Sequence, residues 1–278
     1  MRALLVRESQ LGDNEAPEPR PLPEPDGVLR WGRPVLLPLS SAMRVATTER
    51  VIALTYDDGP NPEQTPGVLD ALARHDVRAT FFVLTDRAEE HPELVREMLA
   101  RGHEVGLHGI DHTRLTSLPG REASRRIREG KRRLEAVTGR PVTLYRPTYG
   151  AQGMLQFLTT RRLGMDVVIW TAWARDWADA PAAEVAGRAI GALHPGAIVL
   201  LHDTTDDTRE EDLPRPSFAR GEVTELILNG MRDKGFRAVP AGELLARYRS
   251  VRAVTTQRPR LRLHRRPGPS GPAGPPQP

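Results

Sequence analysis

Short runs of β-branched and aromatic residues alternate along the chain with longer segments in which apolar residues recur every three or four positions. The short runs predict strands, and the longer periodic segments predict amphipathic helices. We expect strands at residues 51–56, 78–83, 103–107, 142–145, 165–170, 197–201 and 236–239. We expect helices at residues 63–75, 88–101, 119–138, 152–163, 181–193, 219–234 and 240–249, each following one of those strands.

This strand-then-helix order predicts parallel strands joined by crossover helices, so the fold class is α/β. A closed barrel and an open doubly wound sheet both satisfy the order. Prolines alternate with other residues between Glu15 and Asp26, which predicts an extended linker. We expect residues 1–45 to be an N-terminal extension with this linker, residues 46–250 to be a single domain, and residues 251–278 to be a disordered tail rich in arginine and proline.

The chain has a net charge of +4, from 40 basic and 36 acidic residues. Residues 251–278 hold six arginines and no acid, so subtracting these six from +4 leaves −2 for the rest of the chain. A body of that charge gives no reason to expect nucleic acid as a partner.

The chain contains no cysteine, so a metal site must use His, Asp or Glu as ligands. The apolar run at residues 3–6 is too short for the core of a signal peptide, and no apolar run reaches membrane-spanning length. We therefore expect a cytoplasmic protein without a membrane partner.

Ionisable residues lie at or just beyond the C-terminal ends of the predicted strands. They are Asp57 and Asp58 after the first strand, His108 after the third, Arg146 after the fourth, Asp176 after the fifth and His202 after the sixth. The C-terminal ends of parallel strands assemble one face of an α/β fold. We therefore expect these residues to meet in one active site.

His108 and His112 are four positions apart, so on a helix they would share a face and could bind one divalent ion. Asp57 and Asp58 stand together before Gly-Pro, a sequence that is by itself typical of a tight turn with a helix cap. A cap needs only one of the two carboxylates. If Asp58 binds the ion, Asp57 stays free to accept a proton from a water molecule whose pKa the ion lowers.

Five motifs occur in order along the chain: TYDDGP at 55–60, HGIDH at 108–112, RPTYG at 146–150, WARDW at 173–177 and LLHD at 200–203. Over about residues 50–249 the chain resembles the polysaccharide deacetylase family, also called the NodB-homology family or carbohydrate esterase family 4. The resemblance implies a distorted (β/α)7 barrel.

The resemblance also implies roles for the residues that match the motifs. Asp57 would be the general base, and Arg146 would pair with it and hold it ionised. Asp58, His108 and His112 would bind a divalent metal ion, most often zinc.

On the other side of the reacting group, the resemblance implies that the backbone N–H of Tyr149 stabilises the oxyanion. His202 would be the general acid that protonates the leaving amine, and Asp176 would hydrogen-bond to it and favour its protonated form. Trp177 and Leu200 would line the pocket for the acyl methyl group.

Four positions depart from the family motifs. Tyr56 replaces Phe, and its hydroxyl needs a partner. Gly109 replaces Ser or Thr between the histidines, which we expect to loosen that turn, and Thr148 replaces a Pro. Trp173 stands where the first Asp of D-x-x-D-W is expected, and we interpret it as a residue that narrows the sugar site or stacks on a sugar.

Together with these residues, the resemblance implies a metal-dependent deacetylase that hydrolyses the N-acetyl amide of an N-acetylated sugar or polysaccharide to acetate and a free amine. One alternative is a hydrolase of non-sugar C–N bonds, such as an amidase or imidase. Another is a non-catalytic carbohydrate-binding protein on the same scaffold, which the presence of both aspartates, both histidines, Arg146 and His202 disfavours.

Overall fold

The structure is a computed structural model that describes residues 3–6, 36–205 and 214–255. Its main sheet has the strand order β7-β6-β5-β4-β3-β9-β8, with β10 also paired to β3, and every pairing is parallel. The strands are β3 (Val51–Asp57), β4 (Thr80–Leu84), β5 (Glu104–Gly109), β6 (Leu144–Tyr145), β7 (Asp166–Val167), β8 (Ala172–Trp173), β9 (Ile198–His202) and β10 (Arg237–Ala238).

The connection between the two edge strands forces this sheet to curl. Only residues 168–171 separate β7 from β8, although the two strands lie at opposite edges. Seven strands laid flat would place the edges about 29 Å apart, whereas the chain from Val167 to Ala172 reaches at most about 17 Å. The edges therefore approach each other, and β2 (Ser41–Ala46) bridges to Val168 and Ala197 there. This is the expected distorted (β/α)7 barrel, and the open sheet is excluded.

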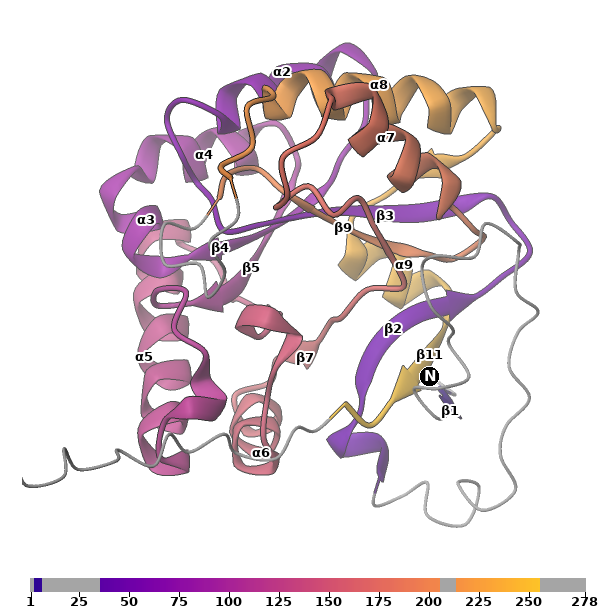
Figure 1. Cartoon of the computed structure of the whole chain (residues 1–278). Helices are drawn as coiled ribbons and strands as arrows, with labels where there is room; N and C mark the ends of the chain where they lie inside the picture. Colours follow the sequence, from indigo (N-terminus) through magenta and orange to yellow (C-terminus); the bar gives the residue numbers. More distant parts are fainter. Residues whose placement is uncertain (1–2, 7–35, 206–213, 256–278) are drawn as a thin grey trace, which may run out of the picture.

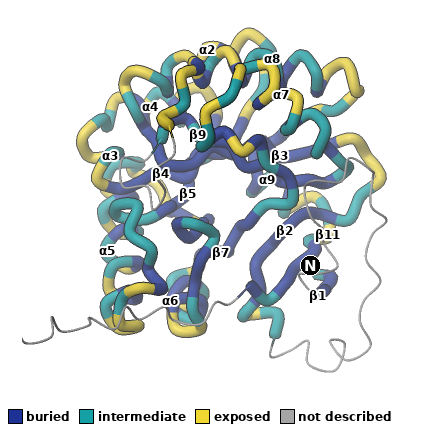
Figure 2. The backbone as a smooth tube through the Cα atoms, viewed as in Figure 1, coloured by how far each residue is buried: buried dark blue, intermediate teal, exposed yellow. Residues whose placement is uncertain are grey.

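Helices cover the outside of the curled sheet (Figure 1). They are α2 (Thr65–Arg74), α3 (Thr85–Glu90), α4 (Pro92–Ala100), α5 (Gly120–Thr138), α6 (Met154–Arg162), α7 (Ala182–Gly191), α8 (Arg220–Asp233) and α9 (Ala241–Arg247). Figure 2 shows that the central strands are buried and that exposed residues lie on the helices and in the turns at the surface. Among the described helices, none is both long enough and apolar enough to cross a membrane.

Two expected elements differ in the structure. The single helix expected at 88–101 is divided into α3 and α4 at His91, because the proline at position 92 disfavours helical backbone in the residue before it. The strand expected at 165–170 pairs with β6 over only two residues, since the chain then leaves that edge to reach β8.

A second, three-stranded sheet joins distant parts of the chain. In it β11 (Arg249–Ala253) pairs in parallel with β1 (Leu4–Val6) and antiparallel with β2. Thus β1 lies within the expected extension 1–45, and β11 continues three residues past position 250. Most of residues 1–45 and 251–278 lies outside the described residues, so the expected division of the chain stays a prediction.

Helices α2 and α8 approach each other most closely at two glycines. A Cβ atom added to Gly221 would lie 2.7 Å from the carbonyl oxygen of Gly67, and this neighbour is backbone that cannot rotate away. This contact matters for the site, because α2 follows the two aspartates and α8 begins beside Asp176.

We predict that Gly221→Ala destabilises the protein by about 1–3 kcal/mol, the usual cost of overpacking a closely fitted contact. The matched control is Gly187→Ala in α7, where nothing lies within 4 Å of the new Cβ and the substitution should be neutral or stabilising. The measurement is the free energy of unfolding from denaturant titrations. Equal effects of the two substitutions would contradict the close helix contact.

Candidate active site

The sheet brings the sequence-predicted residues to one edge. Asp57 ends β3 and His202 ends β9, and the register of these two parallel strands pairs the two residues directly. His108 lies near the end of β5, and Arg146 directly follows β6. The expected metal-ligand and proton-transfer residues therefore come from the C-terminal ends of strands or from the loops after them, as the strand-end pattern predicts, whereas Leu200 lies in the middle of β9.

Asp58, His108 and His112 form a compact cluster of possible metal ligands. Asp58 Oδ1 lies 3.3 Å from His108 Nε2 and 3.3 Å from His112 Nε2. One ligand atom from each residue lies within 4.8 Å of the other two, and within the described residues no other group of three His, Cys, Asp or Glu does so. Two imidazoles and a carboxylate suit a divalent ion such as zinc.

The two histidines do not share a helix, which corrects the expectation from their spacing. His108 lies in β5, and His112 lies in the turn after it. Asp111 closes this turn by accepting a hydrogen bond from Thr113 N at 3.0 Å and by an ion pair with Arg126 at 2.6 Å. A Cβ on Gly109 would lie 2.7 Å from the Asp111 carbonyl oxygen, so glycine accompanies a tight turn and not the loosened one that we expected.

The surroundings of the cluster fit a bound cation. His108 Nδ1 lies 2.8 Å from the backbone oxygen of Arg146, so the ring donates there and turns its Nε2 lone pair toward Asp58. Asp58 Oδ1 is buried and accepts no hydrogen bond within the described residues. Burial opposes ionisation of Asp58, but the positive charge of His112 and His108 in their protonated form holds its pKa below the usual range. A buried carboxylate oxygen that faces two imidazole nitrogens is a ready position for a metal ion.

Beside this cluster, Asp57 is held by a buried arginine. Arg146 Nη1 donates to Asp57 Oδ1 and to Thr55 Oγ1, both at 2.7 Å, and Arg146 Nε donates to the carbonyl oxygen of Val168. The guanidinium also lies over the ring of Phe82, 4.2 Å from its centroid. Arg146 is completely buried, so its attachment to Asp57 is rigid and shielded from water.

On the neighbouring strand β9, His202 is bound to Asp176. His202 Nδ1 donates to Asp176 Oδ1 at 2.8 Å, and the backbone N–H of His202 donates to Asp176 Oδ2 at 2.7 Å. Burial by itself would lower the pKa of His202, but the carboxylate of Asp176 raises it to about 9, with smaller contributions from Asp58 and Asp57. His202 is therefore protonated at neutral pH, as a general acid must be.

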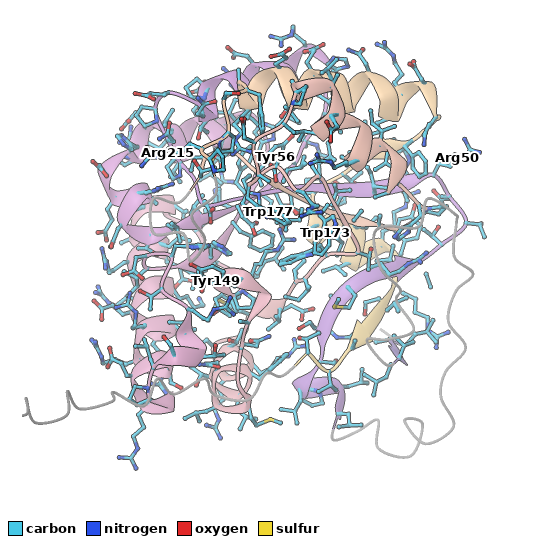
Figure 3. The ribbon with its side chains drawn as sticks, viewed as in Figure 1. Arg50, Tyr56, Tyr149, Trp173, Trp177 and Arg215 are labelled. Atoms are coloured by element: carbon cyan, nitrogen blue, oxygen red, sulfur yellow. The ribbon has the colours of Figure 1, made fainter. Side chains whose placement is uncertain are left out.

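Aromatic residues line the His202 side of the site. The Trp177 ring lies edge-on to His202 at 5.8 Å between centroids, and Trp173 lies edge-on to Trp177 at 5.7 Å. Leu200 is the register partner of Trp173 and lies two positions before His202, on the same face of β9. Figure 3 shows Trp173, Trp177 and Tyr149 around the centre of the curled sheet.

Tyr149 lies on the metal-cluster side. Its backbone is left-handed, with φ of 59°, and its ring lies 4.4 Å from that of His112. The guanidinium of Arg114 lies over the same ring, 4.2 Å from its centroid. A left-handed non-glycine residue is strained backbone that the surroundings must hold in place.

Sequence reasoning gave no role to Asp203, which ties the two aspartates to β9. Its buried carboxylate accepts hydrogen bonds from Gly59 N at 3.0 Å and from Thr65 Oγ1 at 2.6 Å, and burial raises its pKa to about 6. A Cβ on Gly59 would lie 2.0 Å from Asp203 Oδ2, so only glycine fits. The sequence signal that could have indicated this contact is that the chain contains both motifs, DDG at 57–59 and LLHD at 200–203.

Sequence reasoning also missed Arg220, whose side chain reaches Asp176 from the first turn of α8. Nothing in the motif pattern indicated it, because it lies far along the chain from Asp176. By contrast, the hydroxyl of Tyr56 finds the partner it needs, Thr224 Oγ1, at 3.2 Å.

These features define a class: a parallel α/β barrel whose carboxyl edge carries an aspartate–histidine cluster beside two candidates for proton transfer, Asp57 held by Arg146 and His202 held by Asp176. Comparisons with known proteins agree. A family model described as polysaccharide deacetylase matches residues 44–168. The chain is 32% identical over 229 residues to a peptidoglycan-N-acetylglucosamine deacetylase of Bacillus cereus, covering 81% of this chain and 96% of that protein. It is 34% identical over 209 residues to a chitooligosaccharide deacetylase of Sinorhizobium fredii, covering 73% and 96%.

A solved structure supports the same relationship. The crystal structure of a peptidoglycan N-acetylglucosamine deacetylase aligns with a TM-score of 0.65 at 28% identity, covering 73% of this chain and 92% of that chain. The chain belongs to the polysaccharide deacetylase family, which are hydrolases of C–N bonds other than peptide bonds. This confirms the resemblance seen in the motifs.

We predict that His108→Ala and Asp58→Asn each weaken Zn²⁺ binding by more than about 100-fold, because loss of a partner that only orients a ligand already costs 10–100-fold. Asp57→Asn should bind Zn²⁺ nearly as the wild type does. His91→Ala, a partly exposed histidine at the break between α3 and α4, is the control. Isothermal titration calorimetry measures the binding, and unchanged affinity in Asp58→Asn would exclude this metal site.

Proposed function

We propose that this protein hydrolyses the N-acetyl amide of an N-acetylated sugar or polysaccharide to acetate and a free amine. The observation that carries this proposal is the placement of three groups on one sheet edge. The Asp58–His108–His112 cluster lies beside the Asp57–Arg146 pair, and the His202–Asp176 pair follows on the next strand, where His202 is the register partner of Asp57. Hydrolysis of an unactivated amide needs a base, an electrophile and an acid, and this arrangement offers one candidate for each.

We further propose that the cluster holds zinc. Two histidines and one carboxylate are a ligand set of catalytic zinc sites, and Asp58, His108 and His112 would hold the ion here. When bound, the ion would polarise the amide carbonyl and lower the pKa of water.

Asp57 then accepts the proton of the attacking water. Arg146 fixes the orientation of this carboxylate through the 2.7 Å bond to Oδ1, while Oδ2 points toward the cluster, 3.9 Å from His108 Nε2. Because Arg146 is buried and bonded to three groups, Asp57 has little freedom to turn away. This is preorganisation of a general base.

The chain's other residues complete the reaction. The backbone N–H of Tyr149 donates to the oxygen that becomes negative when water adds to the carbonyl. His202 donates its Nε2 proton to the leaving nitrogen, so that the C–N bond breaks and a neutral amine departs. Trp177 and Leu200 enclose the acetyl methyl group, and Trp173 contacts the sugar.

The proposal is tested by measuring acetate release together with zinc content. The panel contains N-acetylglucosamine oligomers, small N-acetylated sugars and N-acetylated non-sugar amines. We expect one zinc per chain, acetate release from the sugars, loss of activity on chelation and recovery with Zn²⁺. Asp57→Asn should keep its zinc and lose about 10²–10⁴ in kcat.

Other outcomes identify the alternatives. Turnover of the non-sugar amides alone would indicate an amidase or imidase. Sugar binding without acetate release from any compound would indicate a carbohydrate-binding protein. Full activity after exhaustive chelation would overturn the role of the metal.

The pH profile tests His202 as the acid. An acid must be protonated, so kcat/KM falls as pH rises through its pKa, which Asp176 raises to about 9. Removing the carboxylate in Asp176→Asn should move this alkaline limb downward by more than about one pH unit, toward the ordinary histidine value near 6.5. Asp179→Asn, an exposed residue of the same loop, should leave it unchanged. Coincident limbs for Asp176→Asn and wild type would show that His202 is not the acid.

A further inference from the structure

Arg220 is a buried arginine that the family motifs do not include. It opens α8 with only 4% of its surface exposed. Its Nη1 donates to both the backbone oxygen of Asp176 at 2.7 Å and to Asp176 Oδ2 at 3.0 Å. One nitrogen thus holds both the main chain and the side chain of the residue that binds His202.

The carboxylate of Asp176 accepts three hydrogen bonds as a result. Oδ1 accepts from His202 Nδ1, and Oδ2 accepts from both His202 N and Arg220 Nη1. Since Oδ2 is fixed by two donors, the carboxylate cannot rotate, and Oδ1 stays in the plane that orients the imidazole. Without Arg220, the carboxylate would keep only the two bonds from His202, the residue that it has to orient.

Arg220 is itself held in place by contacts with α2 and the preceding loop. Its backbone N–H donates to Gln64 Oε1 at 3.1 Å, and its guanidinium lies over Phe218 at 4.9 Å. The next residue, Gly221, makes the close contact with Gly67 of α2. The orientation of Asp176 is thereby tied to the helix that follows the two aspartates.

The electrostatic environment of Asp176 also supports a role for Arg220. Burial would raise the pKa of Asp176, whereas His202 and then Arg220 lower it, so the carboxylate stays ionised while fully enclosed. Without Arg220, the negative charge of the buried Asp176 carboxylate would be balanced by protonated His202 alone. Removing one partner from a buried network of charges leaves the remaining charges without full compensation.

We propose that Arg220 is a positioning residue for the general acid: it locks the Asp176 carboxylate so that His202 presents its Nε2 proton to the leaving amine. Arg220 thus fixes the carboxylate that orients the proposed acid, as Arg146 fixes the carboxylate of the proposed base, Asp57. The role of Arg220 in catalysis rests on the proposed deacetylase activity, whereas its role in fixing the Asp176 carboxylate does not.

The first experiment compares Arg220→Gln, Arg220→Lys and Arg220→Ala with the control Arg232→Gln. Arg232 is an exposed arginine of the same helix whose side chain donates to Asn229 Oδ1 at 2.8 Å. We expect kcat of Arg220→Gln and Arg220→Ala to fall about 100-fold, the usual effect of a small misplacement at a reacting centre, while KM changes less than about threefold. Arg220→Lys should retain most of kcat, because a single nitrogen makes both bonds. Millimolar guanidinium should restore part of kcat in Arg220→Ala and have no such effect on the control.

The second experiment needs no substrate. The His202 Nδ1 proton, bonded to a carboxylate, should give a downfield ¹H NMR signal that is absent in His202→Gln. We expect it in the wild type and in Arg220→Lys, and expect it broadened or lost in Arg220→Gln. A retained signal in folded Arg220→Gln would overturn the proposal, as would a kcat within about twofold of wild type, or a loss that neither lysine nor guanidinium rescues. Because this signal is independent of turnover, it separates failure of the positioning role from failure of the deacetylase assignment.

Discussion

The parallel pairing of β3 with β9 is the constraint on which the site depends. Its register sets Asp57 opposite His202, one strand spacing apart, so the two groups proposed to move protons face the same reacting bond. Asp58 follows immediately and turns into the cluster with a left-handed backbone, φ 77°. A slip of one residue in this register would turn one of the two side chains to the other face of the sheet.

Around this register the chain places two buried Arg–Asp pairs, Arg146–Asp57 and Arg220–Asp176. Buried ion pairs are a poor source of stability, because desolvation of both charges offsets much of their attraction. Their value here is orientation: each fixes a carboxylate whose direction matters for a proton transfer. Asp203, bonded to Gly59 and Thr65, adds a third tie between β9 and the loop of the two aspartates. These buried polar groups contribute little to stability, but they hold the side chains of the site in place before substrate binds.

The alternation of strands and helices was visible in the sequence, because central strands such as β3 are continuous apolar runs and end at conspicuous charges. The charges at the strand ends also identify five residues of the site, because each strand end directs its residue to the same edge of the sheet. They are Asp57, Asp58, His108, Arg146 and His202. Closure of the barrel was not derivable from periodicity, because it follows from how few residues join β7 to β8. The three-stranded sheet and Arg220 were missed because they join positions far apart in the chain, for which no local pattern exists. The looseness expected at Gly109 was wrong because the approach of Asp111 is a property of the folded turn.

The central claim is that Asp58, His108 and His112 hold a divalent ion while Asp57 stays free beside it. The most direct measurement is a crystal structure of the zinc-loaded protein with anomalous scattering at the zinc edge. The account predicts a single strong peak about 2.0–2.2 Å from His108 Nε2, His112 Nε2 and an Asp58 oxygen, with Asp57 still bonded to Arg146 and not to the ion. A peak elsewhere, or an ion bound by Asp57 in place of Asp58, would contradict it.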